Sequence, residues 1–368
     1  MKFLAGNMNI ALVHDWLTNV AGGERVVLVL KEIFPDAPIY TSVFNPKCSQ
    51  PFSKFDVRTS FLQKIPFMKS RRELLVPFAP FAFEQFDLGK YDLVISSSSM
   101  ASKGVITKPD TIHVCYCHTP SRYLWDPEVD PRAKSGKFSF LRQLTAHRLR
   151  IWDKVASQRV DYFIANSKFV QSRIKKFYNR DSVVVYPPVD IKKYKSVEDI
   201  KPKDYFLFVS RLVNYKKCDL VIDAFNDLGL PLKIIGRGPE KKQLQKKAKK
   251  NIEFLGYLTD QEVKKYYSEA RAFVFAAEED FGLVPVEAMA AGRPVIAYSK
   301  GGTAETVIDG KTGLLFDEQT PQCLIDTVKK FDSYNFDSKL IEDHAINFSK
   351  ERFVENFNNA LVKILKDK

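Results

Sequence analysis

Short apolar runs alternate with longer amphipathic stretches along almost the whole chain. This alternation is typical of parallel strands connected by helices, because a crossover between parallel strands needs a dozen or more residues. The runs form two sets. The first set predicts strands at residues 9–13, 38–43, 91–96, 112–117, 161–165 and 183–186. The second set predicts strands at residues 205–209, 232–236, 252–255, 272–276, 294–298 and 313–316.

This pattern predicts an α/β fold with two Rossmann-like, doubly wound parallel-sheet domains. A chain of 368 residues is also long for a single hydrophobic core. Prolines at 187–188 and at 202 bracket a polar segment, so we place the boundary near residue 196. The domains then cover residues 1–195 and 196–349. Because ligands of open α/β sheets bind beyond the carboxyl ends of the strands, both domains are expected to face one interdomain cleft.

The composition narrows the class of protein further. With 45% hydrophobic and 27% charged residues, the chain is neither disordered nor fibrous. Its five cysteines have no framework spacing, and no apolar run reaches the roughly 18 residues that span a bilayer, so we expect a cytoplasmic protein. The net charge of +13 favours an anionic partner, which charge alone does not identify as nucleic acid, nucleotide diphosphate or membrane surface.

The most specific motif is EDFGLVPVE, residues 279–287, directly after the predicted strand 272–276. Gly282 lets backbone N–H groups approach a ligand closely, and the helix that follows points its positive end at a phosphate. Glu279 then lies before the helix near the reacting end, while Glu287 lies inside it and can accept hydrogen bonds from ribose hydroxyls. The alternative is that Glu279 caps the helix and Glu287 is a surface charge.

Two cations, Arg211 and Lys216, follow the predicted strand 205–209. An arginine clamps two phosphate oxygens at once and a lysine adds a point charge. The pair therefore suits a leaving diphosphate.

In this order and spacing the motifs resemble glycosyltransferase family 4, the retaining sugar transferases of GT-B fold. The resemblance rests on Arg211 with Lys216, on GRGPE at 236–240, on FLGYL at 254–258, and on the motif at 279–287.

The resemblance implies that Arg211 and Lys216 hold the nucleotide diphosphate, that Glu279 lies beside the donor sugar, and that Glu287 binds the ribose. Lys217 departs from the family, which commonly has glycine after the lysine. The further donor-side residues that the resemblance implies are Gly236, Gly238, Leu258, Phe281, Gly282, Leu283 and Val284.

The first half of the chain carries its own candidates. Gly22 and Gly23 open a helix directly after the first strand, a turn that can cradle an anion. His118 follows the strand 112–117, where the family has a functional histidine that orients a sugar hydroxyl or shares proton movement; the alternative is a histidine that merely ends the strand. The remaining acceptor-side candidates are Arg122, Tyr123, Asp126 and Asn166. Asn166 with Ser167 is also a plain helix N-cap.

No metal site is expected in the run His113, Cys115, Cys117 and His118. Alternate residues on a strand lie nearly 7 Å apart, whereas zinc ligands converge to about 2.0–2.3 Å from the ion. The chain also has no Asp-x-Asp triplet. We therefore expect a metal-independent reaction with no cofactor, in which cationic side chains and a helix end stabilise the leaving diphosphate.

Basic and aromatic residues are interleaved over residues 64–86. Such a mixture is typical of a patch that contacts an anionic membrane, and equally of a buried aromatic core with a basic rim. The residues concerned are Lys64, Lys69, Arg71, Arg72, Phe67, Phe78, Phe81, Phe83 and Phe86.

Together these features predict a retaining glycosyltransferase that moves a sugar from a nucleotide diphosphate sugar to a saccharide or lipid-linked acceptor. Residues 13–25 and 118–123 look most like mannosyltransferase-type members that build bacterial lipopolysaccharide, O-antigen or capsule, so GDP-mannose is the donor we expect.

The last helix, residues 350–368, is expected to pack back on the first domain. The alternatives are a nucleotide-sugar epimerase or glycogen-type synthase of the same fold, a catalytically silent scaffold, and a protein that binds nucleic acid or another polyanion. No recognisable nucleic-acid module is present to support the last of these.

Overall fold

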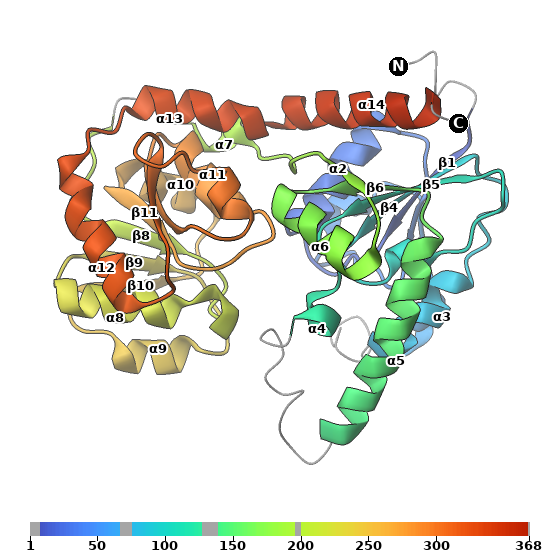
Figure 1. Cartoon of the computed structure of the whole chain (residues 1–368), viewed down its shortest axis with the longest axis horizontal. Helices are drawn as coiled ribbons and strands as arrows, with labels where there is room; N and C mark the ends of the chain where they lie inside the picture. Colours follow the sequence, from blue (N-terminus) through green and yellow to red (C-terminus); the bar gives the residue numbers. More distant parts are fainter. Residues whose placement is uncertain (1–7, 67–75, 127–138, 196–199, 367–368) are drawn as a thin grey trace. The chain divides into compact units, whose positions relative to one another are not determined.

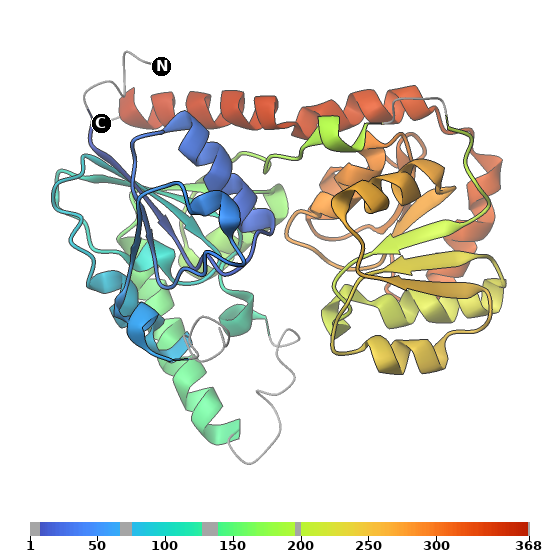
Figure 2. The ribbon, with the colours of Figure 1, turned by 180° about the vertical axis from the view of Figure 1, so that it is seen from behind.

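A computed structural model describes residues 8–66, 76–126, 139–195 and 200–366. The chain divides into two compact units: unit 1 comprises residues 1–188 and 353–368, and unit 2 comprises residues 189–352. The break therefore lies between Pro188 and Val189, earlier than the position near residue 196 suggested by the prolines. Each unit is a parallel sheet covered by helices on both faces, so the predicted α/β class of two Rossmann-like domains is confirmed (Figure 1, Figure 2).

The sheet of unit 1 has seven parallel strands in the order β3-β2-β1-β4-β5-β6-β7. The strand β3 has no counterpart in the sequence prediction, because this short edge strand carries one apolar residue between polar neighbours and leaves no apolar run. The strands are β1 (Ile10–His14), β2 (Ile39–Thr41), β3 (Val57–Thr59), β4 (Leu93–Ser98), β5 (Ile112–Cys117), β6 (Tyr162–Ala165) and β7 (Ser182–Val184).

The helices of unit 1 are α2 (Gly22–Ile33), α3 (Ala79–Glu84), α4 (Arg122–Trp125), α5 (Ser139–Gln158), α6 (Lys168–Tyr178) and the greater part of α14 (Lys350–Lys366). Helix α14 buries Phe353, Phe357, Leu361 and Ile364, which recur every three or four residues along one face. These side chains join the core formed by α2 and the central strands, so the end of the chain completes unit 1.

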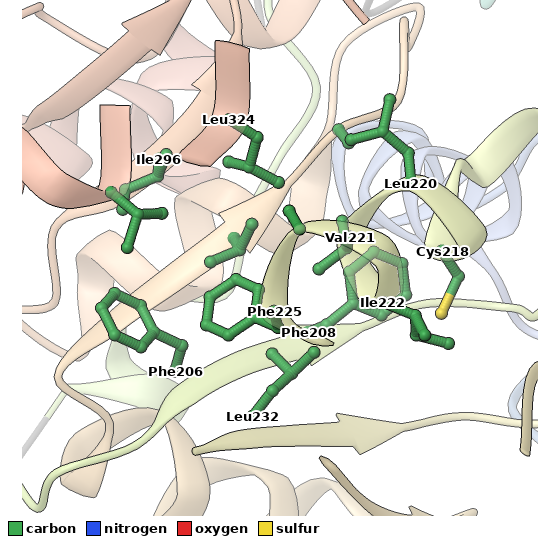
Figure 3. Close-up of a cluster of buried hydrophobic side chains, with 14 of the residues drawn as sticks. Phe206, Phe208, Cys218, Leu220, Val221, Ile222, Phe225, Leu232, Ile296 and Leu324 are labelled. Carbon is green, nitrogen blue, oxygen red and sulfur yellow. The ribbon is translucent and has the colours of Figure 1, made fainter. Parts of the chain in front are cut away.

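The sheet of unit 2 has six parallel strands in the order β10-β9-β8-β11-β12-β13. They are β8 (Phe206–Val209), β9 (Leu232–Ile235), β10 (Ile252–Gly256), β11 (Ala272–Phe275), β12 (Val295–Tyr298) and β13 (Gly313–Phe316). The helices are α7 (Ile191–Tyr194), α8 (Cys218–Leu228), α9 (Lys241–Lys247), α10 (Asp260–Glu269), α11 (Leu283–Ala290), α12 (Pro321–Lys330) and α13 (Ser338–Ala345). Figure 3 shows Phe206, Phe208 and Leu232 from the sheet packed against Phe225 of α8.

Both strand orders have the same consequence for function. Counted from the first strand of each unit, the chain runs outward to one edge and then returns to continue on the other side of that first strand. The order therefore reverses between β1 and β4 in unit 1 and between β8 and β11 in unit 2. Ligands of open α/β sheets bind beyond the carboxyl ends of the strands at such a reversal.

The aromatic segment 64–86 is only partly a surface. Phe83 is 1% exposed in a core cluster of unit 1, and Phe86 packs against the rings of Tyr40 and Phe83. For these two residues the predicted membrane patch is wrong, because their side chains fill the space between α3 and the sheet. Phe78 and Phe81 are exposed, and residues 67–75 lie outside the described residues. No helix in the described ranges is both long and apolar enough to cross a bilayer.

Candidate active site

In unit 2 the loops after β8 and β11 bring Lys216 and Glu279 together. Nζ of Lys216 donates a hydrogen bond to Oε1 of Glu279 and forms an ion pair with it. Each side chain is 17% exposed, so the pair remains accessible to a ligand. Because β8 and β11 flank the reversal of strand order, the pair lies where a Rossmann-like sheet binds its ligand.

The local backbone explains how Lys216 is held. Residues Asn214–Lys216 form a 3-10 turn, and Lys217 adopts a left-handed conformation with φ of 54° before α8 begins. Nζ of Lys216 lies 5.6 Å from the ring centre of Tyr215 and 5.7 Å from that of Phe275, so two aromatic faces also support its charge. Lys217, where the family commonly has glycine, therefore keeps the turn in a conformation that glycine adopts more easily.

Arg211 lies at the start of the same loop and is exposed. Within the described part of the chain its guanidinium has no hydrogen-bond or ion-pair partner, although its carbonyl accepts a hydrogen bond from the backbone of Val213. Its five N–H donors are therefore available to an anion from solution.

Gly236 and Gly238 allow the loop after β9 to pack directly on the loop after β8. A Cβ at Gly236 would lie 1.9 Å from the carbonyl oxygen of Ser210, and one at Gly238 would lie 2.0 Å from that of Leu212. The N–H of Leu212 also donates to the carbonyl of Arg237 at 3.0 Å. Only glycine fits at both positions, and the contact fixes the backbone on each side of Arg211.

The helix α11 begins after Gly282, whose φ is 88°, and no side chain caps it. The alternative in which Glu279 caps this helix is therefore wrong. Glu287 is only 7% exposed and accepts a hydrogen bond from the hydroxyl of Tyr267 at 3.3 Å, so it is not a surface charge.

The other donor-side residues of this motif lie around the start of α11. Phe281 turns its ring into the protein, where it is 3% exposed and packs against Phe348. Leu283 and Val284 form the first turn of α11, and Leu258 lies in the loop after β10; their proposed ligand contacts remain predictions.

Sequence reasoning missed a third loop at this edge, after β12. A Cβ at Gly301 would lie 2.7 Å from the carbonyl oxygen of Glu279, and one at Gly302 would lie 2.3 Å from that of Asp280. The N–H of Gly302 donates to the carbonyl of Glu279 at 2.7 Å. This loop therefore supports the backbone that carries Glu279. A glycine pair directly after an apolar strand was the available signal, the same one used for Gly22 and Gly23.

Arg237 and Tyr257 form a second unpredicted feature of unit 2. The guanidinium of Arg237 stacks over the ring of Tyr257 at 4.7 Å, and the tyrosine is 68% exposed. Tyr257 precedes Leu258, so a flat, exposed aromatic surface lies beside the loop that the family resemblance assigns to the base.

In unit 1 the helix start at Gly22–Gly23 lies against two histidines. A Cβ at Gly23 would be 3.4 Å from Nε2 of His118 and 3.4 Å from Cε1 of His14. His14 ends β1, and His118 follows β5. Two of the predicted features, the glycine turn and His118, are therefore neighbours at the carboxyl edge of this sheet, together with His14, which was not predicted as a site residue.

Ser97 of β4 connects the two histidines. Its Oγ lies 2.7 Å from Nε2 of His118 and 3.2 Å from Nδ1 of His14, and that Nδ1 also lies 3.0 Å from the carbonyl oxygen of Ser97. A carbonyl only accepts, so His14 must carry its proton on Nδ1. The Ser97 hydroxyl can then donate to Nε2 of His118 while it accepts from His14, an arrangement in which a neutral His118 carries its proton on Nδ1.

His118 is neutral at physiological pH in this environment. Although its side chain retains some solvent contact, burial and the nearby His14 lower the pKa of His118 to about 3. A neutral imidazole with Nδ1–H can donate one hydrogen bond, and no described residue lies in hydrogen-bonding distance of that nitrogen. In that tautomer the Nδ1–H of His118 is free to donate; its contact with a ligand remains a prediction.

Asp15 organises the loop beyond β4 and was also missed. Burial alone would raise its pKa, but His14 and the backbone N–H groups of Ser99, Ser102 and Ala101 outweigh burial and hold the pKa of Asp15 below its ordinary value. Its Oδ1 accepts from Ala101 and Ser102 at 2.8 Å each. A carboxylate this well satisfied has a structural role.

The remaining predicted residues of unit 1 lie on other elements. Arg122 and Asp126 form an ion pair of 3.0 Å along α4, while Tyr123 packs beside the core cluster around Leu124.

Asn166 is buried directly after β6, and its N–H donates to the carbonyl of Cys117 at 3.3 Å, which sets it beside His118. Ser167 caps α6 by accepting from Val170 at 2.9 Å, so the N-cap interpretation holds for Ser167. Acceptor binding by these residues remains a prediction.

The run from His113 to Cys117 is a buried strand. His113, Cys115 and Cys117 are each 1% exposed or less, and burial raises the pKa of the Cys117 thiol well above its ordinary value. Among the described residues no group of three or more His, Cys, Asp or Glu side chains could hold a metal ion.

Both units match models of protein families. Residues 20–193 match "Glycosyltransferase Family 4", and residues 190–343 match "Glycosyl transferases group 1". An uncharacterized glycosyltransferase of Methanocaldococcus jannaschii is 30% identical over 207 residues, which span 55% of this chain and 58% of that protein. An alpha-1,3/1,6-mannosyltransferase of Dictyostelium discoideum is 26% identical over 438 residues, covering 97% of this chain and 98% of the relative.

The fold is also that of solved structures. The Anabaena protein HepE, crystallised with UDP and glucose, superposes with a TM-score of 0.67 at 18% identity, covering 97% of this chain and all of HepE (100%). At that identity the likeness establishes the architecture alone.

Proposed function

We propose that this chain, a glycosyltransferase of the family 4 type, transfers a sugar from a nucleotide diphosphate sugar to a saccharide or lipid-linked acceptor with retention at the anomeric carbon. One observation carries the proposal: the ion pair of Lys216 and Glu279 at the reversal of strand order in unit 2. It supports the proposal because the cation that we assign to the leaving diphosphate and the carboxylate that we assign to the donor sugar lie in contact.

Each donor-side group then has a chemical role. Arg211 and Lys216 draw negative charge onto the departing diphosphate, and the uncapped start of α11 adds backbone N–H groups. Glu287, held by Tyr267, accepts hydrogen bonds from the ribose. His118 donates its Nδ1–H to a sugar hydroxyl, and the departing phosphate oxygens help to take the acceptor proton.

We propose mannose as the sugar and GDP as the carrier. The Dictyostelium relative is named as a mannosyltransferase, which supports this choice. The HepE structure holds UDP and glucose, which makes UDP-glucose the alternative donor.

We also propose the class of acceptor. We infer a cytoplasmic enzyme that extends bacterial lipopolysaccharide, O-antigen or capsule precursors, as the resemblance of residues 13–25 and 118–123 suggests.

We also propose that the reaction needs no metal, because cationic side chains take the place of a divalent ion. Excess EDTA should then leave the rate of sugar transfer unchanged, and a rate restored only by Mg²⁺ or Mn²⁺ would disprove this part.

The experiment that tests the donor is a thermal-shift series with GDP, UDP, ADP and their sugars on the whole chain. A ligand that binds only the folded protein raises the melting temperature by mass action. GDP and GDP-mannose are expected to give the largest shifts. A shift with UDP alone would replace the donor, and equal shifts with any polyphosphate would favour polyanion binding without catalysis.

A further inference from the structure

The long helix α5 has two apolar faces, and the fold uses only one of them. On the inner face Ala146 and Leu149 are 6% and 7% exposed and pack in one cluster with Leu124 of α4. Further along, Asp153 is fully buried and forms an ion pair with Lys103. These contacts attach α5 firmly to unit 1.

The outer face of α5 is equally apolar and lies open to solvent. Its apolar residues are Phe140, Leu141, Leu144, Ile151 and Val155, with exposures of 78%, 59%, 37%, 55% and 52%. Leu141, Leu144, Ile151 and Val155 recur at intervals of three, seven and four residues and so form one stripe along the helix. Figures 1 and 2 show the first turns of α5 extending away from the sheet of unit 1. A stripe of this length is unusual on a surface that has no partner.

The charges on α5 indicate what kind of partner fits. Its basic residues are Arg142, Arg148, Arg150 and Lys154. Its single acidic residue, Asp153, is buried and neutralised by Lys103. Arg148 is exposed in the gap of the apolar stripe between Leu144 and Ile151. The outer face therefore combines apolar side chains with positive charge alone.

A neighbouring segment adds two aromatic side chains. Phe78 and Phe81, next to and within α3, are 51% and 64% exposed. Two hydrogen bonds to Glu84 attach α3 to this part of unit 1. The indole N–H of Trp152 in α5 donates at 2.8 Å, and the guanidinium of Arg159, directly after α5, donates at 2.6 Å. Both views show α3 beside α5 (Figure 1, Figure 2).

We propose that the outer face of α5 docks on an anionic lipid surface, with Phe140, Leu144 and Ile151 among the acyl chains and Arg148 and Lys154 at the headgroups. A second copy of the chain fits less well, because pairing two α5 helices would juxtapose their arginines without an acidic residue to balance them. An anionic bilayer satisfies both the apolar stripe and the charge. The inference does not depend on sugar transfer.

The test is sedimentation of the whole chain with vesicles of phosphatidylcholine alone and of phosphatidylcholine with phosphatidylglycerol. The test variant is the double substitution Leu144→Glu with Ile151→Glu. The control is Leu340→Glu on α13, a leucine in unit 2 whose exposure of 43% lies between those of Leu144 and Ile151. Arg148→Glu with Lys154→Glu tests the charge separately. All these side chains are outside the core, so circular dichroism and nucleotide binding should match the wild type.

The wild type and Leu340→Glu are expected to bind the anionic vesicles at low salt and to bind neutral vesicles at least about tenfold more weakly. Both double variants should lose binding to anionic vesicles by about tenfold or more. Failure of the wild type to bind, or undiminished binding by the Leu144/Ile151 variant, would overturn the proposal. A wild-type dimer that the same variant converts to a monomer would also overturn it, since the occupant would then be a second copy.

Discussion

Lys216 reaches from the loop after β8 to Glu279 in the loop after β11, and their ion pair joins the two strands at which the order of the second sheet reverses. Each side chain is 17% exposed, so a ligand can reach the pair and exchange partners with it. An incoming diphosphate would compete with Glu279 for Lys216. The carboxylate that we propose to lie beside the donor sugar would thus oppose the binding of the bare nucleotide.

Glu279→Gln should therefore have opposite effects on binding and turnover. Removal of the carboxylate charge frees Lys216, so the affinity for the nucleotide diphosphate should rise about 3- to 10-fold, while sugar transfer should fall at least about 100-fold. Calorimetric titration and a transfer assay on the same preparation measure both. Loss of binding together with turnover would mean that Glu279 supports the fold of the loop rather than the reaction.

Ser97 is expected to act through His118. Ser97→Ala removes the hydroxyl that donates to Nε2 of His118, so the tautomer is no longer fixed and turnover should fall about tenfold with little change in KM. Nitrogen NMR of the imidazole should show Nδ1–H in the wild type and a mixture in the variant. Ser97→Cys, which keeps a weak donor, should lie between them. An unchanged NMR signature in Ser97→Ala would remove Ser97 from the mechanism.

Two glycines of unit 2 should differ sharply when replaced by alanine. At Gly238 the new Cβ would lie 2.0 Å from a backbone oxygen, so unit 2 should lose about 2–3 kcal/mol of unfolding free energy. At Gly229, where φ is 69° and no atom lies within 4 Å, the cost should be only the left-handed backbone, about 1 kcal/mol. Urea unfolding of both variants gives the comparison. Equal losses would contradict the close packing of the loops after β8 and β9.

Stability should fall as the solution is acidified, beginning below pH 6.5. Burial lowers the pKa of His113 to about 3, and burial with His14 does the same for His118. Between pH 6.5 and 3 the unfolded chain therefore binds more protons than the folded one. The unfolding free energy then falls with falling pH, by up to about 1.4 kcal/mol per pH unit for each histidine.

The measurement is urea unfolding at pH 7, 6 and 5. His113→Asn should flatten the dependence of the unfolding free energy on pH, whereas replacement of the exposed His147 by Gln should not. A slope that His113→Asn leaves unchanged would show that other groups cause the acid sensitivity.

Most of the fold could be predicted from sequence because buried parallel strands are continuous apolar runs. Twelve strands were expected, and the described residues contain thirteen. The missing one, β3, has the sequence Val-Arg-Thr and is held by its neighbour β2 rather than by its own composition. The segment 64–86 shows the opposite difficulty: an aromatic run does not reveal which rings face inward, and Phe83 does while Phe81 does not.

The site residues could be predicted where a sequence motif directly follows one strand. Contacts between residues on different strands could not be predicted, because they depend on how the strands are ordered and aligned. Lys216 and Glu279 are 63 residues apart, and only the order of β8 and β11 makes them partners. His14 and Ser97 were missed because their contact depends on the register of β1 with β4, in which these two residues are directly paired. No local pattern contains that register.

The most direct test of the central claim is calorimetric titration of the whole chain with GDP, UDP and ADP, comparing the wild type with Lys216→Ala and Lys246→Ala. Lys246 is an exposed lysine on α9, so its loss removes the same charge from unit 2 without touching the loop after β8. We predict one nucleotide bound per chain, at least about tenfold weaker binding in Lys216→Ala, and wild-type binding in Lys246→Ala. Equal weakening in both variants, or no binding by the wild type, would contradict the assignment of Lys216 to a nucleotide diphosphate.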